Sequence, residues 1–380
     1  MPKKIRLVLA GGGTGGHIMP NIALIEELRE RFKPEDLEFL YIGTRKGMEK
    51  EKMASLKVPY KGIFCGKLRR YFSWQNLLDF FKVPLGIWQS YWAIRKFKPD
   101  VVFCKGGFVS FPVAIGGWLA GKKVFLHESD VVPGLANRLC EKFASKIMTG
   151  FEESMKYFPK AMIDAGKVFY TGNPVRKWLN AGDQEIGRQI TLLKEDLPVI
   201  LVWGGSQGAS FINNLVWFNL KRFLQNYQLI HICGKGMQRP HEELEGLAGD
   251  RNLLKRYFSC GFAENELKDL YAITDLFISR AGANSLAEME YVERPALLIP
   301  LGLKASRGDQ LENAKVFAKN HSAQVMYEDD YNVDLLFGLI QSLLKGSRGS
   351  YVQKNGHDKN HLKGNTATDR IVDLLTRTRD

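Results

Sequence analysis

A strand, a glycine-rich loop and a helix follow one another in both halves of the chain, and this pattern constrains the fold more than any other feature. Residues 5–10 are an apolar run, residues 11–17 read GGGTGGH, and apolar side chains recur at helical spacing from Ile22. The same order returns at residues 198–203 and at GGSQGA, residues 204–209. Each unit brings free backbone N–H groups and the positive end of a helix dipole to the carboxyl end of a strand. We therefore predict an α/β protein of two similar parallel-sheet domains, with the glycine loops facing a shared cleft.

Length and composition agree with two globular domains. The 380 residues suffice for two domains of roughly 100–200 residues each. A hydrophobic content of 45% and an aromatic content of 11% are typical of a chain with packed cores. No apolar run reaches the roughly 18–20 residues of a membrane span, and residues 5–10 are too short for a signal peptide. The five cysteines show neither a CxxC pair nor a metal-ligand spacing, so we expect small core side chains in a reducing cytoplasm.

The net charge of +13 indicates an acidic partner or needs some other explanation. Nucleic acid, an anionic lipid surface and diphosphate ligands all fit such a charge. The chain contains no RNP, zinc-finger or helix-turn-helix pattern, so no nucleic-acid partner is predicted.

One segment within residues 60–92 combines basic and aromatic side chains. Its apolar positions outnumber what one buried helix face needs. Two interpretations stay open, a segment lying on an anionic bilayer and a helix packed in the domain core. The side chains that would contact a bilayer are Lys67, Arg69, Arg70, Tyr71, Phe72, Trp74, Phe80, Phe81 and Trp88.

The domain junction is predicted at residues 172–176, GNPVR, where Pro and Gly interrupt the pattern and a new sheet begins. We assign residues 1–170 to the first domain and residues 171–350 to the second. Residues 351–380 are expected to form a terminal segment whose last helix packs back on the first domain. Arg176 is a candidate phosphate contact because guanidinium pairs with phosphate bidentately, or else an exposed linker charge.

The first glycine loop contains a G-x-G-x-x-G match, but a dinucleotide site is not favoured. The second strand ends at Gly43 and Thr44, without the acidic residue that a ribose of NAD requires. The glycines still allow a ligand to approach the backbone closely. His17 follows this loop at the start of a helix, where an imidazole is either a proton acceptor or a structural side chain.

Residues 279–314 contain two strand–loop–helix corners in succession. Both corners present a helix start at the carboxyl edge of a sheet, which suits phosphate. Glu288 lies one turn into the first of these helices, where its carboxylate could accept hydrogen bonds from two ribose hydroxyls. This combination indicates a nucleotide-sugar site. In the first domain, polar residues also follow a strand at His127, Glu128 and Asp130, either as substrate ligands or as a turn.

Taken together, these motifs resemble one known family. GGGTGGH, HESD with PGLANRL, TGNPVR, GGSQGA and SRAGANSLAE with RPALLIPL and SRGDQLENA occur in the order found in the MurG family of N-acetylglucosaminyltransferases, and SRGDQ and HESD are similar to its Gram-positive branch. The resemblance covers almost the whole chain. It implies a GT-B fold, that is, two Rossmann-like domains around a cleft. It also implies an enzyme of glycosyltransferase family 28 on the cytoplasmic side of the cell membrane, which transfers GlcNAc from UDP-GlcNAc to the C4 hydroxyl of MurNAc in lipid I with inversion, giving lipid II.

The resemblance also assigns residues to the two substrates. Thr14, Gly15, Gly16 and His17 are implied to face the acceptor and the reacting centre, and Thr14, Gly15, Gly16 and Asp130 are assigned to UDP-GlcNAc binding. Our hypothesis for the catalytic base is His17, with Glu128 as the second candidate. Glu288 is implied to bind the ribose, Gln310 the GlcNAc hydroxyls and the backbone of Ala263 the uracil. The implied diphosphate contacts are Arg176, Ser206, Ala283, Asn284, Ser285, Leu286 and Ala287. Residues 60–92 match the family's membrane-facing patch.

Two departures from the family pattern concern sugar contacts. Asp309 precedes Gln310 where well-studied members carry two Gln residues, and Asp130 stands where many carry Asn. We expect no metal and no cofactor, because no acidic metal motif is placed to serve the diphosphate. Two other enzyme functions remain as rivals, a GT-B transferase for another lipid and a UDP-GlcNAc epimerase-like enzyme. A nucleotide-binding protein without catalysis is a third.

Overall fold

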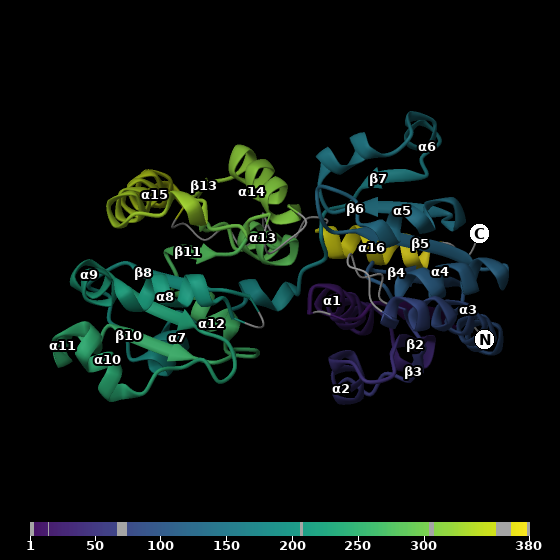
Figure 1. The fold of residues 1–380 in the computed structure, drawn as a ribbon, viewed down its shortest axis with the longest axis horizontal. Coiled ribbons are helices and arrows are strands. Elements are labelled where there is room, and N and C mark those ends of the chain that lie inside the picture. The colour runs from purple at the N-terminus through teal and green to yellow at the C-terminus, as the bar shows by residue number, and fades with distance from the viewer. Residues whose placement is uncertain are drawn as a thin grey trace. The chain divides into compact units, whose positions relative to one another are not determined.

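The computed structural model describes residues 4–13, 15–66, 74–205, 208–303, 308–354 and 366–377, with side chains except those of 74–81 and 347–354. The chain forms two compact units (Figure 1). Unit 1 comprises Met1–Arg176 and Leu362–Asp380, and unit 2 comprises Lys177–His361. The boundary therefore follows Arg176, whereas the sequence placed it after residue 170.

Unit 1 is a parallel sheet of seven strands in the order β3-β2-β1-β4-β5-β6-β7, with helices between successive strands. Its elements are β1 (Ile5–Ala10), α1 (Gly15–Arg31), η1 (Pro34–Asp36), β2 (Leu37–Thr44), α2 (Met48–Ser55), β3 (Tyr60–Ile63), α3 (Trp74–Phe97), β4 (Val101–Cys104), α4 (Ser110–Leu119), β5 (Lys123–Glu128), α5 (Leu135–Cys140), η2 (Glu141–Phe143), β6 (Lys146–Thr149), η3 (Glu152–Tyr157), α6 (Lys160–Asp164), β7 (Val168–Tyr170) and α16 (Ala367–Thr376). The strand order reverses between β1 and β4. In open α/β sheets, ligands bind at the carboxyl ends of the strands at such a reversal.

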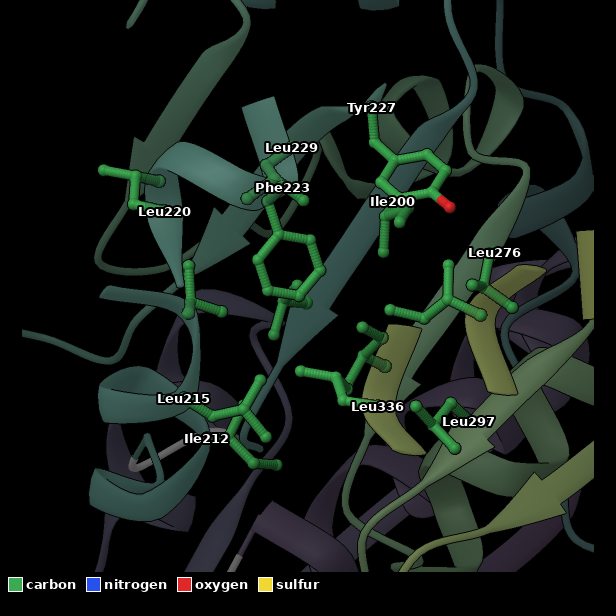
Figure 2. Close-up of a cluster of buried hydrophobic side chains, with 14 of the residues drawn as sticks. Ile200, Ile212, Leu215, Leu220, Phe223, Tyr227, Leu229, Leu276, Leu297 and Leu336 are labelled. Atoms are coloured by element: carbon green, nitrogen blue, oxygen red, sulfur yellow. The ribbon is translucent and has the colours of Figure 1, made fainter. Parts of the chain in front are cut away.

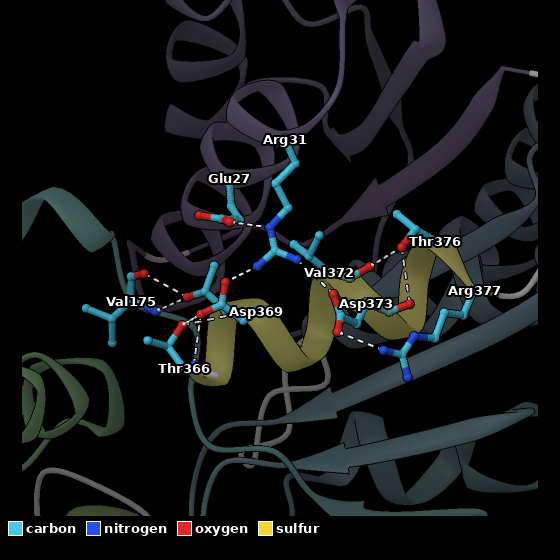
Figure 3. A network of polar contacts seen from close by, with 10 residues as sticks. Glu27, Arg31, Val175, Thr366, Asp369, Val372, Asp373, Thr376 and Arg377 are labelled. Atoms are coloured by element: carbon cyan, nitrogen blue, oxygen red, sulfur yellow. Dashed lines mark hydrogen bonds and ion pairs between the residues drawn. The ribbon is translucent and has the colours of Figure 1, made fainter. Parts of the chain in front are cut away.

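Apolar side chains cover both faces of the unit 1 sheet, as expected for buried parallel strands. One face packs against α1 and the other against α3 and α4. The last helix, α16, belongs to the first of these faces, because Ile371, Val372 and Leu375 are buried beside β1 and α1. Figure 3 shows how its polar side is fixed, with Arg31 of α1 donating to Asp373 at 2.8 Å and pairing with Asp369. Residues from opposite ends of the chain therefore complete one core.

Unit 2 is a parallel sheet of six strands in the order β10-β9-β8-β11-β12-β13, which reverses between β8 and β11. Its elements are η4 (Lys177–Asn180), α7 (Gln184–Thr191), β8 (Val199–Trp203), α8 (Ser210–Phe218), α9 (Leu220–Asn226), β9 (Gln228–Ile232), α10 (His241–Ala248), α11 (Arg251–Leu254), β10 (Tyr257–Cys260), α12 (Leu267–Ala272), β11 (Leu276–Ser279), α13 (Ala283–Tyr291), β12 (Ala296–Leu298), α14 (Asp309–Asn320), β13 (Ala323–Val325), η5 (Glu328–Asp330) and α15 (Val333–Lys354). Its main core lies between the sheet and helices α8, α9 and α15 (Figure 2).

Several sequence expectations about elements were wrong. The sequence GSRG at residues 346–349 predicts a loop, but α15 continues through these residues to Lys354. Glycine in a helix interior costs only about 1 kcal/mol relative to alanine, and Leu336 and Ile340 already bury the helix in the core. The apolar run at residues 295–301 predicts one strand over its whole length, but β12 covers only Ala296–Leu298. Residues 60–63, which were included in the basic aromatic segment, form the edge strand β3.

Candidate active site

At the carboxyl edge of the unit 1 sheet, the loops after β1, β4 and β5 meet. Strands β1 and β4 end in register at Ala10 and Cys104, and the Lys105 N–H donates to the Ala10 carbonyl at 2.9 Å. The edge therefore joins the first glycine loop, the residues that follow β4 and the polar residues that follow β5.

His17 lies in the first turn of α1, half-buried against the residues that follow β4. Its Nδ1 is 3.3 Å from the Lys105 carbonyl oxygen, which can only accept, so Nδ1 carries the hydrogen and Nε2 the lone pair. A Cβ atom at Gly107 would lie 2.8 Å from Cδ2 of His17, and Gly107 has φ +77°, so this position requires glycine. Burial, followed by the Lys105 charge, lowers the pKa of His17 to about 4. The imidazole is therefore neutral at pH 7, with one nitrogen able to accept a proton.

Lys105 is a buried residue of this site that was not predicted from the sequence. Its Nζ is 3.0 Å from Nδ1 of His127 and contacts the Ser129 hydroxyl. Burial lowers the pKa of Lys105 to about 8, while the carboxylates of Glu128 and Asp130 act in the opposite direction. The sequence does contain a pattern that could have indicated Lys105. It is a single lysine between an apolar strand and two glycines, at the edge of the sheet where ligands bind.

Both ring nitrogens of His127 form hydrogen bonds to other residues of unit 1. Its Nδ1 accepts from the Lys105 ammonium, and its Nε2 donates to the Gly172 carbonyl at 2.9 Å. Burial, together with the Lys105 charge, lowers the pKa of His127 well below its usual value. His127 therefore connects the end of β5 to residues 171–173, and a structural role explains it without a ligand.

Glu128 is also held by its own loop. Its Oε1 accepts from the Asp130 N–H at 3.1 Å, and its Oε2 accepts from Gly134 N–H and Asn137 Nδ2, each at 2.8 Å. Burial and the Asp130 carboxylate raise the pKa of Glu128 to about 7, although these hydrogen bonds act against the rise. Gly106 lies between His17 and the residue that binds Glu128. A Cβ atom at Gly106 would lie 3.6 Å from the His17 ring and 3.4 Å from Nδ2 of Asn137, which donates to Glu128. His17 and Glu128 are therefore close together in the structure.

A carboxylate does reach the end of β2, although the sequence of this strand predicts none there. It belongs to Glu49 of α2, whose Oε1 accepts from the N–H and the hydroxyl of Thr44 at 2.8 and 2.6 Å. Glu49 is buried, and a Cβ at Gly12 would lie 2.6 Å from its Oε1. The Glu49 carboxylate therefore stabilises the glycine loop inside unit 1 and is not exposed to bind a ribose.

At the corresponding edge of unit 2, α13 begins directly after the β11 loop. Strands β8 and β11 end in register at Trp203 and Ser279. Glu288 is buried in α13, and its Oε2 accepts from the Tyr271 hydroxyl at 3.0 Å. Gln310 lies at the start of α14, where its Oε1 accepts from the Leu301 N–H at 3.0 Å, which leaves its NH₂ group for another partner.

Other residues assigned to the substrates are spread over both units. Ala283, Asn284, Ser285, Leu286 and Ala287 form the first turns of α13, next to Glu288. Ala263 follows β10, which is separated from β8 by β9. In unit 1, Gly15 and Gly16 begin α1, Asp130 is half-buried, and Arg176 is buried rather than an exposed linker charge. Thr14 and Ser206 lie outside the described residues.

Large apolar side chains are exposed on the two neighbouring helices α3 and α4 of unit 1. Trp88 is 60% exposed and Trp92 52% exposed on α3, and Trp118 and Leu119 are exposed at the end of α4. The side chains of Lys67, Arg69, Arg70, Tyr71, Phe72, Trp74, Phe80 and Phe81 lie outside the description. In the described part of the chain, no helix is both long and apolar enough to cross a bilayer. Among these same residues, no group of three His, Cys, Asp or Glu side chains is arranged to hold a metal ion.

Comparison with known proteins gives consistent matches along the chain. The glycosyltransferase family 28 N-terminal domain matches residues 7–149, and the family 28 C-terminal domain matches residues 199–371. The chain is 44% identical to the UDP-N-acetylglucosamine--N-acetylmuramyl-(pentapeptide) pyrophosphoryl-undecaprenol N-acetylglucosamine transferase 2 of Bacillus cereus, over 89% of this chain and 91% of that protein. A transferase of the same name from Geobacillus kaustophilus is 42% identical, over 100% of this chain and 99% of that protein.

Solved structures share the fold. MurG of Acinetobacter baumannii superposes with a TM-score of 0.69 at 23% identity, covering 98% of this chain and 99% of that chain. A UDP-GlcNAc 2-epimerase from Neisseria meningitidis, bound to UDP-GlcNAc, gives a TM-score of 0.59 at 13% identity, with 98% of each chain covered. At such identities these likenesses concern the fold alone, which is of the predicted GT-B type.

Proposed function

The chain belongs to glycosyltransferase family 28, and from this premise we propose that it transfers N-acetylglucosamine from UDP-GlcNAc to the C4 hydroxyl of MurNAc in lipid I, giving lipid II and UDP with inversion. The observation that carries this proposal is the 42–44% identity, over nearly the whole chain, to transferases whose names state this donor and this undecaprenyl acceptor. The reaction is a step of peptidoglycan synthesis, and the enzyme is a hexosyltransferase.

Unit 2 binds the donor in this proposal. The Glu288 carboxylate accepts hydrogen bonds from the ribose hydroxyls, with Tyr271 fixing its orientation. The diphosphate lies at the start of α13, where residues 283–287 offer N–H groups and the positive end of the helix dipole. Ser206 adds a hydroxyl, the backbone of Ala263 contacts the uracil, and the NH₂ group of Gln310 contacts a GlcNAc hydroxyl. The Leu301 N–H donates to Oε1 of Gln310 and so fixes the orientation of this side chain.

Unit 1 binds the acceptor and takes its proton. The acceptor C4 oxygen forms a bond to the anomeric carbon while the bond from that carbon to the UDP oxygen breaks, and the hydroxyl proton passes to Nε2 of His17. His17 suits this role because its Nδ1 is held by the Lys105 carbonyl and Nε2 keeps its lone pair, and because the residue as a whole is only half-buried. As the new C–O bond forms, the attacking oxygen gains positive charge and its proton becomes more acidic, so that a base of low pKa is able to accept it. Glu128 is the second candidate for this role.

The remaining acceptor and phosphate contacts follow the same division. Thr14, Gly15 and Gly16 face the acceptor at the reacting centre, Asp130 contacts the sugar of UDP-GlcNAc, and Arg176 offsets phosphate charge. The charge that develops on UDP is held by the start of α13, in keeping with electrostatic stabilisation by oriented N–H groups. The donor is consumed as a substrate, and we assign no cofactor.

The exposed face of α3 and α4 is proposed to lie on the cytoplasmic surface of the cell membrane. Trp88, Trp92 and Trp118 provide the apolar contact that an interfacial segment needs. The preceding residues Lys67, Arg69 and Arg70 would add attraction to anionic lipid. This placement makes the enzyme a peripheral membrane protein with direct access to a lipid-borne acceptor.

A transfer assay with labelled UDP-GlcNAc tests the function. We expect label to appear in lipid only when undecaprenyl-diphosphate-MurNAc-pentapeptide is supplied, and UDP to be released in equal amount. Transfer only to a different polyprenyl-diphosphate sugar would replace the acceptor assignment. Conversion of UDP-GlcNAc to its 2-epimer without any acceptor would favour the epimerase alternative, and binding without turnover would leave only a nucleotide-binding protein.

A further inference from the structure

We propose that Lys105 is a positioning residue for the proton-accepting side of the site: its carbonyl orients His17, and its buried ammonium holds the loop that carries Glu128. One residue would then align both groups able to take the acceptor proton. The inference rests on the proposed function, because it concerns the reaction at that same edge.

The backbone of Lys105 links the end of β1 to the first turn of α1. Its N–H donates to the Ala10 carbonyl at 2.9 Å, and its carbonyl oxygen lies 3.3 Å from Nδ1 of His17. The next two residues, Gly106 and Gly107, have φ values of +90° and +77°, so the chain turns beside the imidazole without a Cβ atom against it. This geometry leaves Nε2 of His17 as the nitrogen with the free lone pair.

The side chain of Lys105 holds the loop after β5 on both sides of Glu128. Its Nζ contacts His127 and Ser129, the residues that immediately precede and follow Glu128. Both partners are fixed in turn, because His127 donates to the Gly172 carbonyl at 2.9 Å and the Ser129 carbonyl accepts from Asn173 Nδ2 at 3.0 Å. A shift of the ammonium would therefore be transmitted to the Glu128 loop.

The burial of this ammonium argues against a purely stabilising role. Lys105 is 1% exposed, and a buried charge costs free energy that an apolar side chain of similar volume would not cost. Retaining a lysine at such a position is understandable if its charge acts on its neighbours. The groups that face it are His17 on α1, and His127, Glu128 and Asp130 at the end of β5, and the charge lowers the pKa of both histidines.

The charge has a consequence for the pH range of the reaction. A cation beside His17 and Glu128 favours their unprotonated forms, which are the forms that can accept a proton. When the cation is removed, the pKa of each group must rise. The acid limb of the pH–rate profile then moves to higher pH, whichever of the two groups is the base.

Lys105→Met tests the inference, since methionine is unbranched, is one atom shorter than lysine and carries no charge. In the lipid I transfer assay we expect kcat to fall about 10²-fold, as for a misplaced reacting group, while KM for UDP-GlcNAc stays within about twofold. The acid limb of kcat/KM should move to higher pH, and the NMR titration midpoint of His17 should rise with it. The Tm should decrease, because the buried Nδ1 of His127 loses its donor and the carboxylates of Glu128 and Asp130 lose the opposite charge, but the protein should stay folded at the assay temperature.

Ser129→Ala is the matched control, because it removes one contact of Nζ and keeps the charge. It should lower kcat less and leave the acid limb where it is. Lys105→Met with wild-type kcat and an unmoved acid limb would overturn the inference, and so would a protein that fails to fold, which would assign Lys105 to stability. If the wild-type chain transfers nothing to lipid I, the proposed function fails instead, and the His17 titration in the two proteins still decides the role of Lys105.

Discussion

The carboxyl edges of the two sheets have the same backbone plan and different side-chain chemistry. Each edge lies where the strand order reverses, and each combines a glycine-rich loop with the start of a helix. In unit 1 this place is occupied by titratable groups, namely the half-buried His17 and the buried Lys105, His127 and Glu128. In unit 2 it is occupied by the start of α13 and by Glu288, which is fixed by a tyrosine hydroxyl.

This difference indicates how one architecture can serve two tasks. Groups with shifted pKa values, held by several hydrogen bonds, suit proton transfer. Backbone N–H groups and a carboxylate that can accept from a diol suit the binding of a nucleotide diphosphate. Under the proposed function, changes at the unit 1 edge should therefore alter the rate, whereas changes at the unit 2 edge should alter the affinity for the donor.

The largest effect is expected from His17→Ala. A general base contributes typically 10²–10⁴-fold, so single-turnover transfer should slow by about this factor. The Kd for UDP-GlcNAc, measured by calorimetry, should stay within about twofold, because unit 2 binds the donor. A loss of less than about tenfold would remove His17 from the role of base and point to Glu128.

Glu288→Ala should produce the opposite pattern. Hydrogen bonds to a charged group are worth about 1.5–3 kcal/mol, which corresponds to an increase of roughly 10–100-fold in the Kd for UDP-GlcNAc. Glu290→Ala is the control, because Glu290 is exposed on the same helix. If both variants bind the donor as the wild type does, the ribose is not held at Glu288.

The pH dependence of kcat/KM separates the two candidate bases within the unit 1 edge. Protonation of a base abolishes its function, so the rate falls as the pH drops below the pKa of the free enzyme's base. If His17 is the base, kcat/KM should change little between pH 7 and pH 5, because the pKa of His17 is about 4 and the imidazole stays unprotonated over this range. With Glu128, whose pKa is about 7, the rate should fall by about fiftyfold over the same range. We expect the first result.

Tyr271→Phe should have the smallest effect of the four. It removes one hydrogen bond from the Glu288 carboxylate, and a net contribution of about 0.5–1.5 kcal/mol corresponds to roughly 2–12-fold weaker donor binding. Tyr291→Phe is the matched control, because that hydroxyl bonds the Lys177 carbonyl instead. Equal weakening in both variants would mean that Tyr271 does not act through Glu288.

Much of the framework follows from local sequence patterns. Short apolar runs followed by glycine predicted the central strands and the loops at their carboxyl ends, and the corner at residues 279–288 placed Glu288 in the first turns of a helix. These features depend on residues that are close in the sequence, so periodicity and glycine placement suffice to find them.

The features that were missed depend on contacts between distant segments. Glu49 reaches the end of β2 from α2, and Lys105 meets His127 only because β4 and β5 are neighbours in the sheet. Glu128 was correctly placed at a strand end, but its capture by Gly134 and Asn137 depends on how the following loop folds back. Composition and residue spacing do not predict such tertiary hydrogen bonds.

A crystal structure of the chain with UDP-GlcNAc is the most direct test of the division between the two units. The account predicts the ribose hydroxyls on the Glu288 carboxylate and the diphosphate at the start of α13. A uridine diphosphate bound instead at the glycine loop of residues 11–16, beside His17, would contradict it.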